Sequence, residues 1–201
     1  FGFVAEAQYC SVSTSLNDCD EWIGEVIFNT IDNSSGCGAY TDFTAISTML
    51  VPSSSYAITV NNGGAIYNQD SVGVFVDWNQ DLDFSGPGER YYLPSDGTGL
   101  QFTGTITVPA SAMVGNTRMR VRMVYNESPS PCGATNYGGA EDYTVNVVSP
   151  CTGSPVAGTL PSNVQQCLGS SGTLSSTGGT NATGLTFQWQ ESPNGTSGWV
   201  N

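Results

Sequence analysis

Apolar and polar residues alternate along much of the chain, in short runs separated by Gly, Pro, Asn and Ser. A period of two is the pattern of a strand that buries one face, and helical periodicity is almost absent. Short strands with frequent turns favour an all-β fold, an antiparallel β-sandwich. The predicted strands are Trp22–Asn29, Tyr40–Ala45, Tyr56–Asn61, Ser71–Asp77, Phe102–Val108, Thr117–Tyr125 and Asp142–Val148.

The composition changes at residues 149–151. Beyond this point the chain is rich in Ser, Gly and Thr, and its only acid is Glu191. Residues 184–190 predict one further strand, centred on Trp189. About 50 residues bury an independent sandwich core only with difficulty, so we expect an incomplete or marginally stable second module. The predicted organisation is an N-terminal linker over 1–8, a β-sandwich over 9–148 and a partial module over 149–201.

The charge balance excludes several classes of protein. The 201 residues include four Arg, no Lys and no His, and 17 carboxylates give a net charge of −13. Without His there is no Ser-His-Asp triad and no His-ligated zinc, and without Lys there is no Schiff base or P-loop lysine. A nucleic-acid partner is also excluded, because phosphate binding needs clustered basic residues.

The six cysteines point to an oxidising compartment. They stand at positions 10, 19, 37, 132, 151 and 167, and no C-x-x-C motif occurs among them. An even number in a polar, Gly-rich chain favours disulfides, although six cysteines allow 15 pairings. The absence of a long apolar run predicts no membrane span. We therefore expect a secreted or cell-surface protein.

The most informative segment is 74–89, where a predicted strand ends and oxygen-bearing side chains follow. Asp77, Asn79, Asp81 and Asp83 occupy every second position, and Glu89 comes after a Gly-Pro-Gly turn. Ca²⁺ takes six to eight oxygen ligands at about 2.3–2.6 Å. Clustered carboxylates repel one another, and the chain has no lysine to offset this repulsion. These five residues therefore predict a calcium site.

The segment differs from the EF-hand loop. Its sixth position is Leu82, where Gly is expected, and Glu89 falls at the thirteenth position rather than the twelfth. No helices flank it, so it is a calcium loop of the D-x-N-x-D type. The alternative is a turn rich in Asp and Asn whose acids are solvated. Mg²⁺ is less favoured, because it rarely occupies a site made of protein ligands alone.

Two further acidic positions stand near a strand with three arginines. Asp42 lies within an alternating strand, and Glu141 and Asp142 follow a glycine turn. Residues 117–123 place three Arg on one face of a strand. Because Arg pairs with carboxylates in bidentate geometry, structural ion pairing is the favoured interpretation. The alternative is an anion site, or a second cation site that includes these acids.

An enzymatic role is not predicted. A glycosidase needs two carboxyl groups about 5–9.5 Å apart in a cleft, and the spacing of Glu25, Glu89 and Glu141 does not establish such a pair. Trp22, Trp78 and exposed tyrosines are able to stack on sugar rings. Aromatic side chains, however, pack in a core more often.

Taken together, the motifs over residues 9–148 resemble the GEVED domain. They are Tyr9-Cys10, Tyr40–Thr44, Val76–Asp81, Gly88-Glu89, Gly104–Pro109, Thr117–Met123, Pro131-Cys132 and Gly139–Tyr143, in the order of the family. The motif that names the family reads Gly-Gly-Ala-Glu-Asp over 138–142 and lacks its first Glu.

The resemblance implies a secreted, non-catalytic β-sandwich of the jelly-roll or Ig-like type. Such modules accompany peptidases and large surface adhesins, mainly in Bacteroidota with type IX secretion. Residues 151–201 resemble the start of the Ig-like repeats that follow these modules, which makes the second module a partial Ig-like one. The implied disulfides are Cys10–Cys132, Cys19–Cys37 and Cys151–Cys167. Ser71 resembles an O-glycosylation site of such bacteria.

The expected function is that of a calcium-stabilised extracellular module, which acts in adhesion or as an accessory domain of a larger protein. Two alternatives are a carbohydrate-binding module that targets an attached hydrolase and a structural spacer or filament unit. The expected partners are an extracellular protein or polysaccharide and further domains of the parent chain.

Overall fold

The computed structural model describes residues 8–14, 19–149, 158–159, 176–179, 197–198 and 200. The chain divides into two compact units, Phe1–Ser149 and Pro150–Asn201. None of the described residues is helical, so this part of the chain contains no helix that could cross a membrane. The strand expected at 184–190 and the expected Cys151–Cys167 pair lie outside the described residues.

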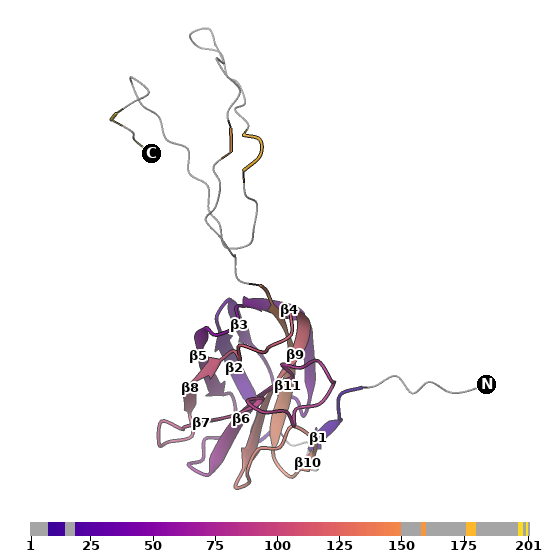
Figure 1. Ribbon diagram of the computed structural model, residues 1–201. Coiled ribbons are helices and arrows are strands. Elements are labelled where there is room, and N and C mark those ends of the chain that lie inside the picture. Colours follow the sequence, from indigo (N-terminus) through magenta and orange to yellow (C-terminus); the bar gives the residue numbers. More distant parts are fainter. Residues whose placement is uncertain are drawn as a thin grey trace, which may run out of the picture. The chain divides into compact units, whose positions relative to one another are not determined.

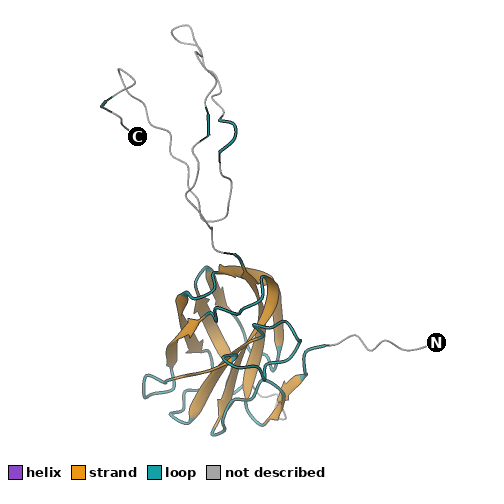
Figure 2. Cartoon of the chain, viewed as in Figure 1, coloured by secondary structure: helices purple, strands orange, loops and turns teal. Residues whose placement is uncertain are grey.

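The first unit is a β-sandwich (Figures 1 and 2). One sheet has five strands, in the order β4 (Thr41–Leu50), β11 (Gly138–Val147), β9 (Gly115–Tyr125), β6 (Asp70–Val76) and β7 (Arg90–Leu93). The other has four, in the order β3 (Ile31–Ser34), β2 (Ile23–Phe28), β5 (Ser55–Asn62) and β8 (Gln101–Thr107). A small third sheet pairs β1 (Val12–Thr14) with β10 (Gly133–Thr135).

Alternating side chains from the two large sheets meet in the core. Val26, Ile58 and Phe102 come from the four-stranded sheet, and Val74 and Val121 come from the five-stranded sheet; all are essentially inaccessible to solvent. Burying each such side chain stabilises the fold by about 1.5–3 kcal/mol. The all-β class and the sandwich that the alternation predicts are therefore confirmed.

Two strand pairings are parallel, which differs from the antiparallel arrangement that the sequence predicts. They join β4 to β11 and β1 to β10, while the other pairings are antiparallel. Parallel neighbours cannot be linked by a tight hairpin, and each of these pairs joins segments far apart in the chain.

One face of β9 packs in the core and the other carries the arginines. Met119, Val121 and Met123 point inward. The intervening Arg118, Arg120 and Arg122 lie on the outer face, where the guanidinium groups of Arg120 and Arg122 reach backbone carbonyls of the segments that include β1 and β10. The strict alternation over 117–123 thus places three cations outside the core.

Two disulfides lie in this unit, one between distant segments and one local. Cys10 is bonded to Cys132 with a Cα–Cα distance of 5.5 Å, and Cys19 is bonded to Cys37 with a Cα–Cα distance of 5.4 Å. Both are pairings that the family resemblance implied. The first ties the strand β1 segment to the segment that leads into β10, over the outer face of the five-stranded sheet.

Candidate functional site

The acid loop, residues 77–89, connects β6 to the edge strand β7. Asp77 and Glu89 stand at its two ends and are 0% and 1% exposed. Asn79, Asp81 and Asp83 lie between them and are exposed. The loop therefore has a buried acidic base and a solvent-facing row of oxygen-bearing side chains.

Asp77 organises the first turn of the acid loop. Its Oδ1 accepts a hydrogen bond from the Asp81 amide at 3.2 Å, and its Oδ2 accepts one from the Leu82 amide at 3.0 Å. The Tyr9 hydroxyl also donates to Asp77 Oδ2, at 2.6 Å. Leu82 has φ 70°, the left-handed region that glycine occupies freely. A side chain at such a position costs about 1–2 kcal/mol, so the loop makes this turn despite its leucine.

The side chains of Asn79 and Asp81 gather beside Asp77. Asn79 Oδ1 lies 3.2 Å from the Asp81 amide nitrogen, the same atom that Asp77 Oδ1 contacts. The Asn79 amide donates to Asp81 Oδ2 at 2.7 Å. Asp81 and Asp83 in turn accept from the backbone amides of Asp83 and Ser85. The three contacts with the backbone amide two residues further on are Asx turns, the geometry of the alternative interpretation. Together with the bond between the Asn79 and Asp81 side chains, they bring Asp77, Asn79 and Asp81 close to one another.

Glu89 closes the loop at its base. Its Oε1 accepts from the amides of Trp78 at 3.0 Å and Asn79 at 3.4 Å, and its Oε2 accepts from the Gly86 amide at 2.7 Å. Burial raises the pKa of this carboxyl, and the charge of Asp77 adds to the effect. The buried carboxyl groups of Asp77 and Glu89 therefore repel one another, and Glu89 also accepts hydrogen bonds from backbone amides.

Of the five predicted calcium ligands, the structure brings Asp77, Asn79 and Asp81 together. Asp83 turns toward Ser85, and a backbone hydrogen bond from that residue lowers the pKa of its carboxyl. Glu89 accepts from three backbone amides, as Asp77 accepts from two backbone amides and the Tyr9 hydroxyl, and it lies at the other end of the loop. Across the described residues, no three Asp, Glu or Cys side chains form a group able to hold a metal ion. A cation here would need the Asn79 amide oxygen, backbone carbonyls or water.

The three acids of the second acidic site do not form one group: Asp42 and Asp142 are register partners on β4 and β11, but Glu141 is turned away from them. Asp142 lies on the outer face of the five-stranded sheet, where Arg120 binds it through Nε at 2.7 Å and Nη2 at 2.8 Å, and Arg118 contacts it at 3.2 Å. Glu141 points to the opposite face, because neighbouring strand residues alternate. Asp42 accepts from the Thr44 amide at 2.9 Å. Structural ion pairing, the favoured interpretation, is thus found for Asp142 but not for Asp42 or Glu141.

Glu141 belongs to a buried network between the two sheets. Tyr143 donates to Glu141 Oε2 at 2.6 Å and accepts from the Asn33 amide at 3.0 Å. Ser35 Oγ is in short contact with Glu141 Oε1 and lies 2.5 Å from the Ile23 carbonyl. Ser35 has one hydroxyl proton, so it satisfies both oxygens only if Glu141 carries a proton of its own. Burial raises the pKa of this carboxyl, which agrees with that assignment.

Replacing Glu141 with glutamine is expected to flatten the pH dependence of stability. A carboxyl whose pKa is raised by folding contributes stability that is fully present below its ordinary value of 4.5 and is lost as the pH rises through the folded value. Glutamine can donate to Ser35 and accept from Tyr143 without titrating. Urea unfolding of wild type and Glu141→Gln between pH 5 and 8 measures the effect.

Burial also raises the pKa values of Asp70 and Glu89, and these two groups contribute to the pH dependence of stability in both proteins. Equal slopes for wild type and Glu141→Gln would show that Glu141 is ionised in the native state. The variant Glu141→Ala serves as the control, because it removes the titrating group and both hydrogen bonds and is expected to be less stable at every pH.

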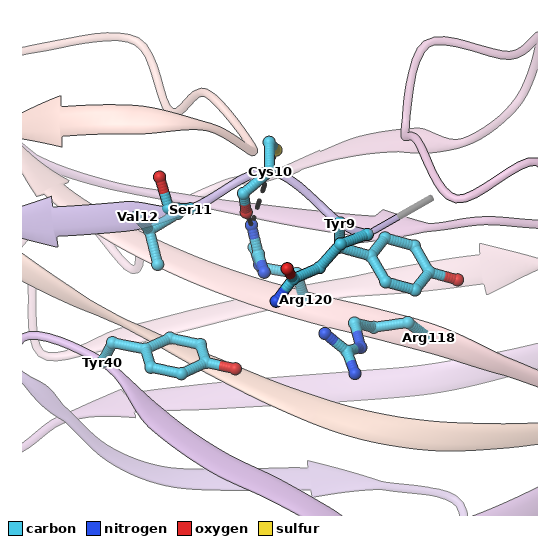
Figure 3. Close-up of a pocket in the computed structure, with 8 residues that line it drawn as sticks. Tyr9, Cys10, Ser11, Val12, Tyr40, Arg118 and Arg120 are labelled. Carbon is cyan, nitrogen blue, oxygen red and sulfur yellow. Dashed lines mark hydrogen bonds between the residues drawn. The ribbon is translucent and has the colours of Figure 1, made fainter. Parts of the chain in front are cut away.

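A hollow on the outer face was not foreseen from the sequence. Tyr9, Tyr40, Arg118 and Arg120 are among the residues that line a cavity of about 390 Å³ (Figure 3). The Arg118 guanidinium lies 4.5 Å from the centre of the Tyr9 ring, and the Tyr40 hydroxyl donates to Asp142 at 3.1 Å. Tyr9 is 68 positions from Asp77, a separation at which sequence spacing carries no signal.

Of the two tryptophans that are candidates for sugar stacking, Trp78 lies in the core and Trp22 is partly accessible. Trp78 is 3% exposed and packs in the core, with its Nε1 donating to the Gly88 carbonyl and to the Tyr91 hydroxyl at 3.1 Å each. Trp22 is half-buried. Ser71, the residue that resembles a glycosylation site, is half-buried in β6, opposite Val124 of β9.

The stretch from β6 to β11 contains the acid loop, the arginine strand β9 and the Glu141–Asp142 pair. Its sequence matches the family model of the GEVED domain over residues 71–146. This stretch is a GEVED domain. Tyr9, Tyr40 and Asp42 precede the matched residues although they belong to the same sandwich. The GEVED domain is not a catalytic family. No curated protein matches the chain.

Proposed function

We propose that this GEVED domain and its sandwich form a non-catalytic, calcium-stabilised extracellular module of a larger secreted or cell-surface protein. The module acts in adhesion or as an accessory domain. The observation that carries the proposal is the first turn of the acid loop. There the side chains of Asp77 and Asn79 both accept from the Asp81 backbone amide, and the Asn79 side chain donates to the Asp81 carboxylate.

The donor chemistry of this turn suits calcium. Asp77, Asn79 and Asp81 supply only oxygen as ligand atoms, and Ca²⁺ accepts carboxylate, amide and carbonyl oxygens in flexible geometry. The ion pairs among the described residues involve Asp142, so none neutralises Asp77 or Glu89. A bound cation would relieve the repulsion between these two buried carboxyl groups.

The two disulfides support an extracellular location, because disulfides persist in oxidising compartments. Carboxylates outnumber arginines, and the resulting net charge of −13 favours solubility. These features and the acid loop together support a module that is stabilised for presentation outside the cell.

Calcium is expected to raise the unfolding midpoint of the wild-type chain. A ligand that binds only the native state adds about 2.7 kcal/mol at a hundredfold excess over its Kd. For a chain of this size, that corresponds to a rise of roughly 5–10 °C. Thermal unfolding in added CaCl₂ and in EGTA measures the shift.

The variant Asp81→Ala should lose most of the calcium response. Asp96→Ala is the matched control, since Asp96 also caps an exposed turn, through Thr98 and Gly99, outside the acid loop. The control should respond to calcium as wild type does. An identical midpoint in CaCl₂ and EGTA for the wild type would contradict the proposal.

A further inference from the structure

We propose that the outer face of β4, β11 and β9 binds a neutral saccharide chain in a groove bordered by Tyr9 and Tyr40. The proposal deepens the proposed function by naming the class of partner, and it rests on the module being extracellular. Three observations support it: two adjoining hollows, walls that combine hydrogen-bonding groups with aromatic rings, and contacts that hold the wall residues in place.

The first hollow is large enough for a sugar ring. Its volume of about 390 Å³ falls within the range of small-ligand sites, roughly 300–1,000 Å³. Figure 3 shows the guanidinium groups of Arg118 and Arg120 between the Tyr40 ring and the Tyr9–Val12 segment. Tyr40 is 39% exposed, and the Arg120 guanidinium lies 5.9 Å from the centre of its ring.

A second, smaller hollow adjoins the first. It has a volume of about 220 Å³, and Thr44, Asn116 and Thr144 are among the residues that line it. Both hollows share Tyr9 and Arg118. Two adjoining hollows suit a chain of several sugar units better than a single small molecule.

The walls supply both hydrogen-bond donors and acceptors beside an aromatic ring. Arg118 makes a single contact with Asp142, at 3.2 Å, and its side chain is 26% exposed, so donors of its guanidinium remain for a ligand. Thr44, Thr144 and Asn116 add hydroxyl and amide groups. Sugar hydroxyls both donate and accept, and sugar rings pack on aromatic faces, so this set matches a saccharide.

Charge favours a neutral saccharide over an acidic one. Asp142 offsets one of the two arginines, and Arg118 also acts on the charge of the nearby Asp42. The whole chain carries a net charge of −13, which repels polyanions at long range. A polymer of uncharged sugars avoids this cost and still uses the donors of Arg118.

The groove is preorganised by contacts from several directions. Arg120 donates through Nη1 to the carbonyls of Cys10 and Pro131, at 2.8 and 2.7 Å, and the disulfide joins Cys10 to Cys132. The Tyr9 hydroxyl donates to Asp77, the first acid of the acid loop. Fixed walls lower the entropic cost of binding. The acid loop thus positions one border of the groove.

Binding of soluble oligosaccharides to the full chain, measured by titration calorimetry, tests the proposal. The probes are short oligomers of glucose, xylose, mannose and N-acetylglucosamine, with oligogalacturonate as the acidic arm. At least one neutral probe should bind. Tyr40→Ala should weaken that binding by roughly tenfold or more, equivalent to about 1.4 kcal/mol. Tyr40→Phe, which keeps the ring, should retain most of the affinity.

Tyr92→Ala is the matched control, because Tyr92 is 59% exposed on β7, away from the groove. It should bind as wild type does. Binding to no neutral probe, preferential binding of oligogalacturonate, or equal losses in Tyr40→Ala and Tyr92→Ala would each overturn the proposal. A calcium-dependent unfolding midpoint without saccharide binding would reject the groove and leave the proposed function standing. Saccharide binding without a calcium response would reject the calcium site and leave the saccharide groove standing.

Discussion

Replacing Asp142 with alanine is expected to lower the free energy of unfolding by about 3–5 kcal/mol. Arg120 is 2% exposed, and Asp142 is its carboxylate partner through two hydrogen bonds, at 2.7 and 2.8 Å. Removing the carboxylate leaves a buried guanidinium without a charged partner, held by two backbone carbonyls, Cys10 Sγ and the neighbouring aromatic rings. Urea denaturation at neutral pH measures the loss.

Asp42→Ala is the control for this experiment. Asp42 pairs in register with Asp142 across the parallel β4–β11 pair but is exposed. Surface substitutions of this kind usually change stability by less than about 0.5 kcal/mol. If Asp142→Ala and Asp42→Ala were equally mild, Arg120 would be solvated or paired in another way, and the ion pair would not support the outer face.

Removal of the Cys10–Cys132 disulfide is expected to destabilise the chain by up to about 5 kcal/mol. The bond spans 122 residues, so it restricts the unfolded chain more than a local bond does. It also keeps the Cys10 carbonyl within reach of Arg120. Thermal and urea unfolding of Cys10→Ala/Cys132→Ala measure the effect.

The local disulfide provides the comparison. Cys19–Cys37 spans 18 residues, and closing a loop of about this length contributes roughly 3 kcal/mol in the chain-entropy model. The double variant Cys19→Ala/Cys37→Ala should therefore lose less stability than Cys10→Ala/Cys132→Ala. The opposite order would show that the segment around Cys10 is not an integral part of the sandwich.

Much of the sandwich could be predicted from the alternation of residues. The predicted strands correspond to β2, β4, β5, β6, β8, β9 and β11, each of six residues or more, over which a period of two is recognisable. The strands missed, β1, β3, β7 and β10, have three or four residues. So short a run shows no period, and tertiary pairing decides its structure.

The candidate site was predictable only where it is local. Asp77, Asn79 and Asp81 meet because alternate positions of a tight turn converge, and spacing reports this. The backbone amides that Glu89 binds, and the Tyr9 hydroxyl on Asp77, depend on how distant segments fold together. Likewise, adjacent Glu141 and Asp142 look like one acidic site in sequence, but strand geometry sends them to opposite faces.

The most direct test of the calcium site is a calorimetric titration of Ca²⁺ into the metal-free wild-type chain at neutral pH. We expect binding of one ion per chain at the acid loop, loss of that binding in Asp81→Ala, and much weaker binding of Mg²⁺, which requires stricter octahedral geometry. No detectable binding of Ca²⁺ to the wild type, or unchanged binding in Asp81→Ala, would contradict the assignment of calcium to Asp77, Asn79 and Asp81.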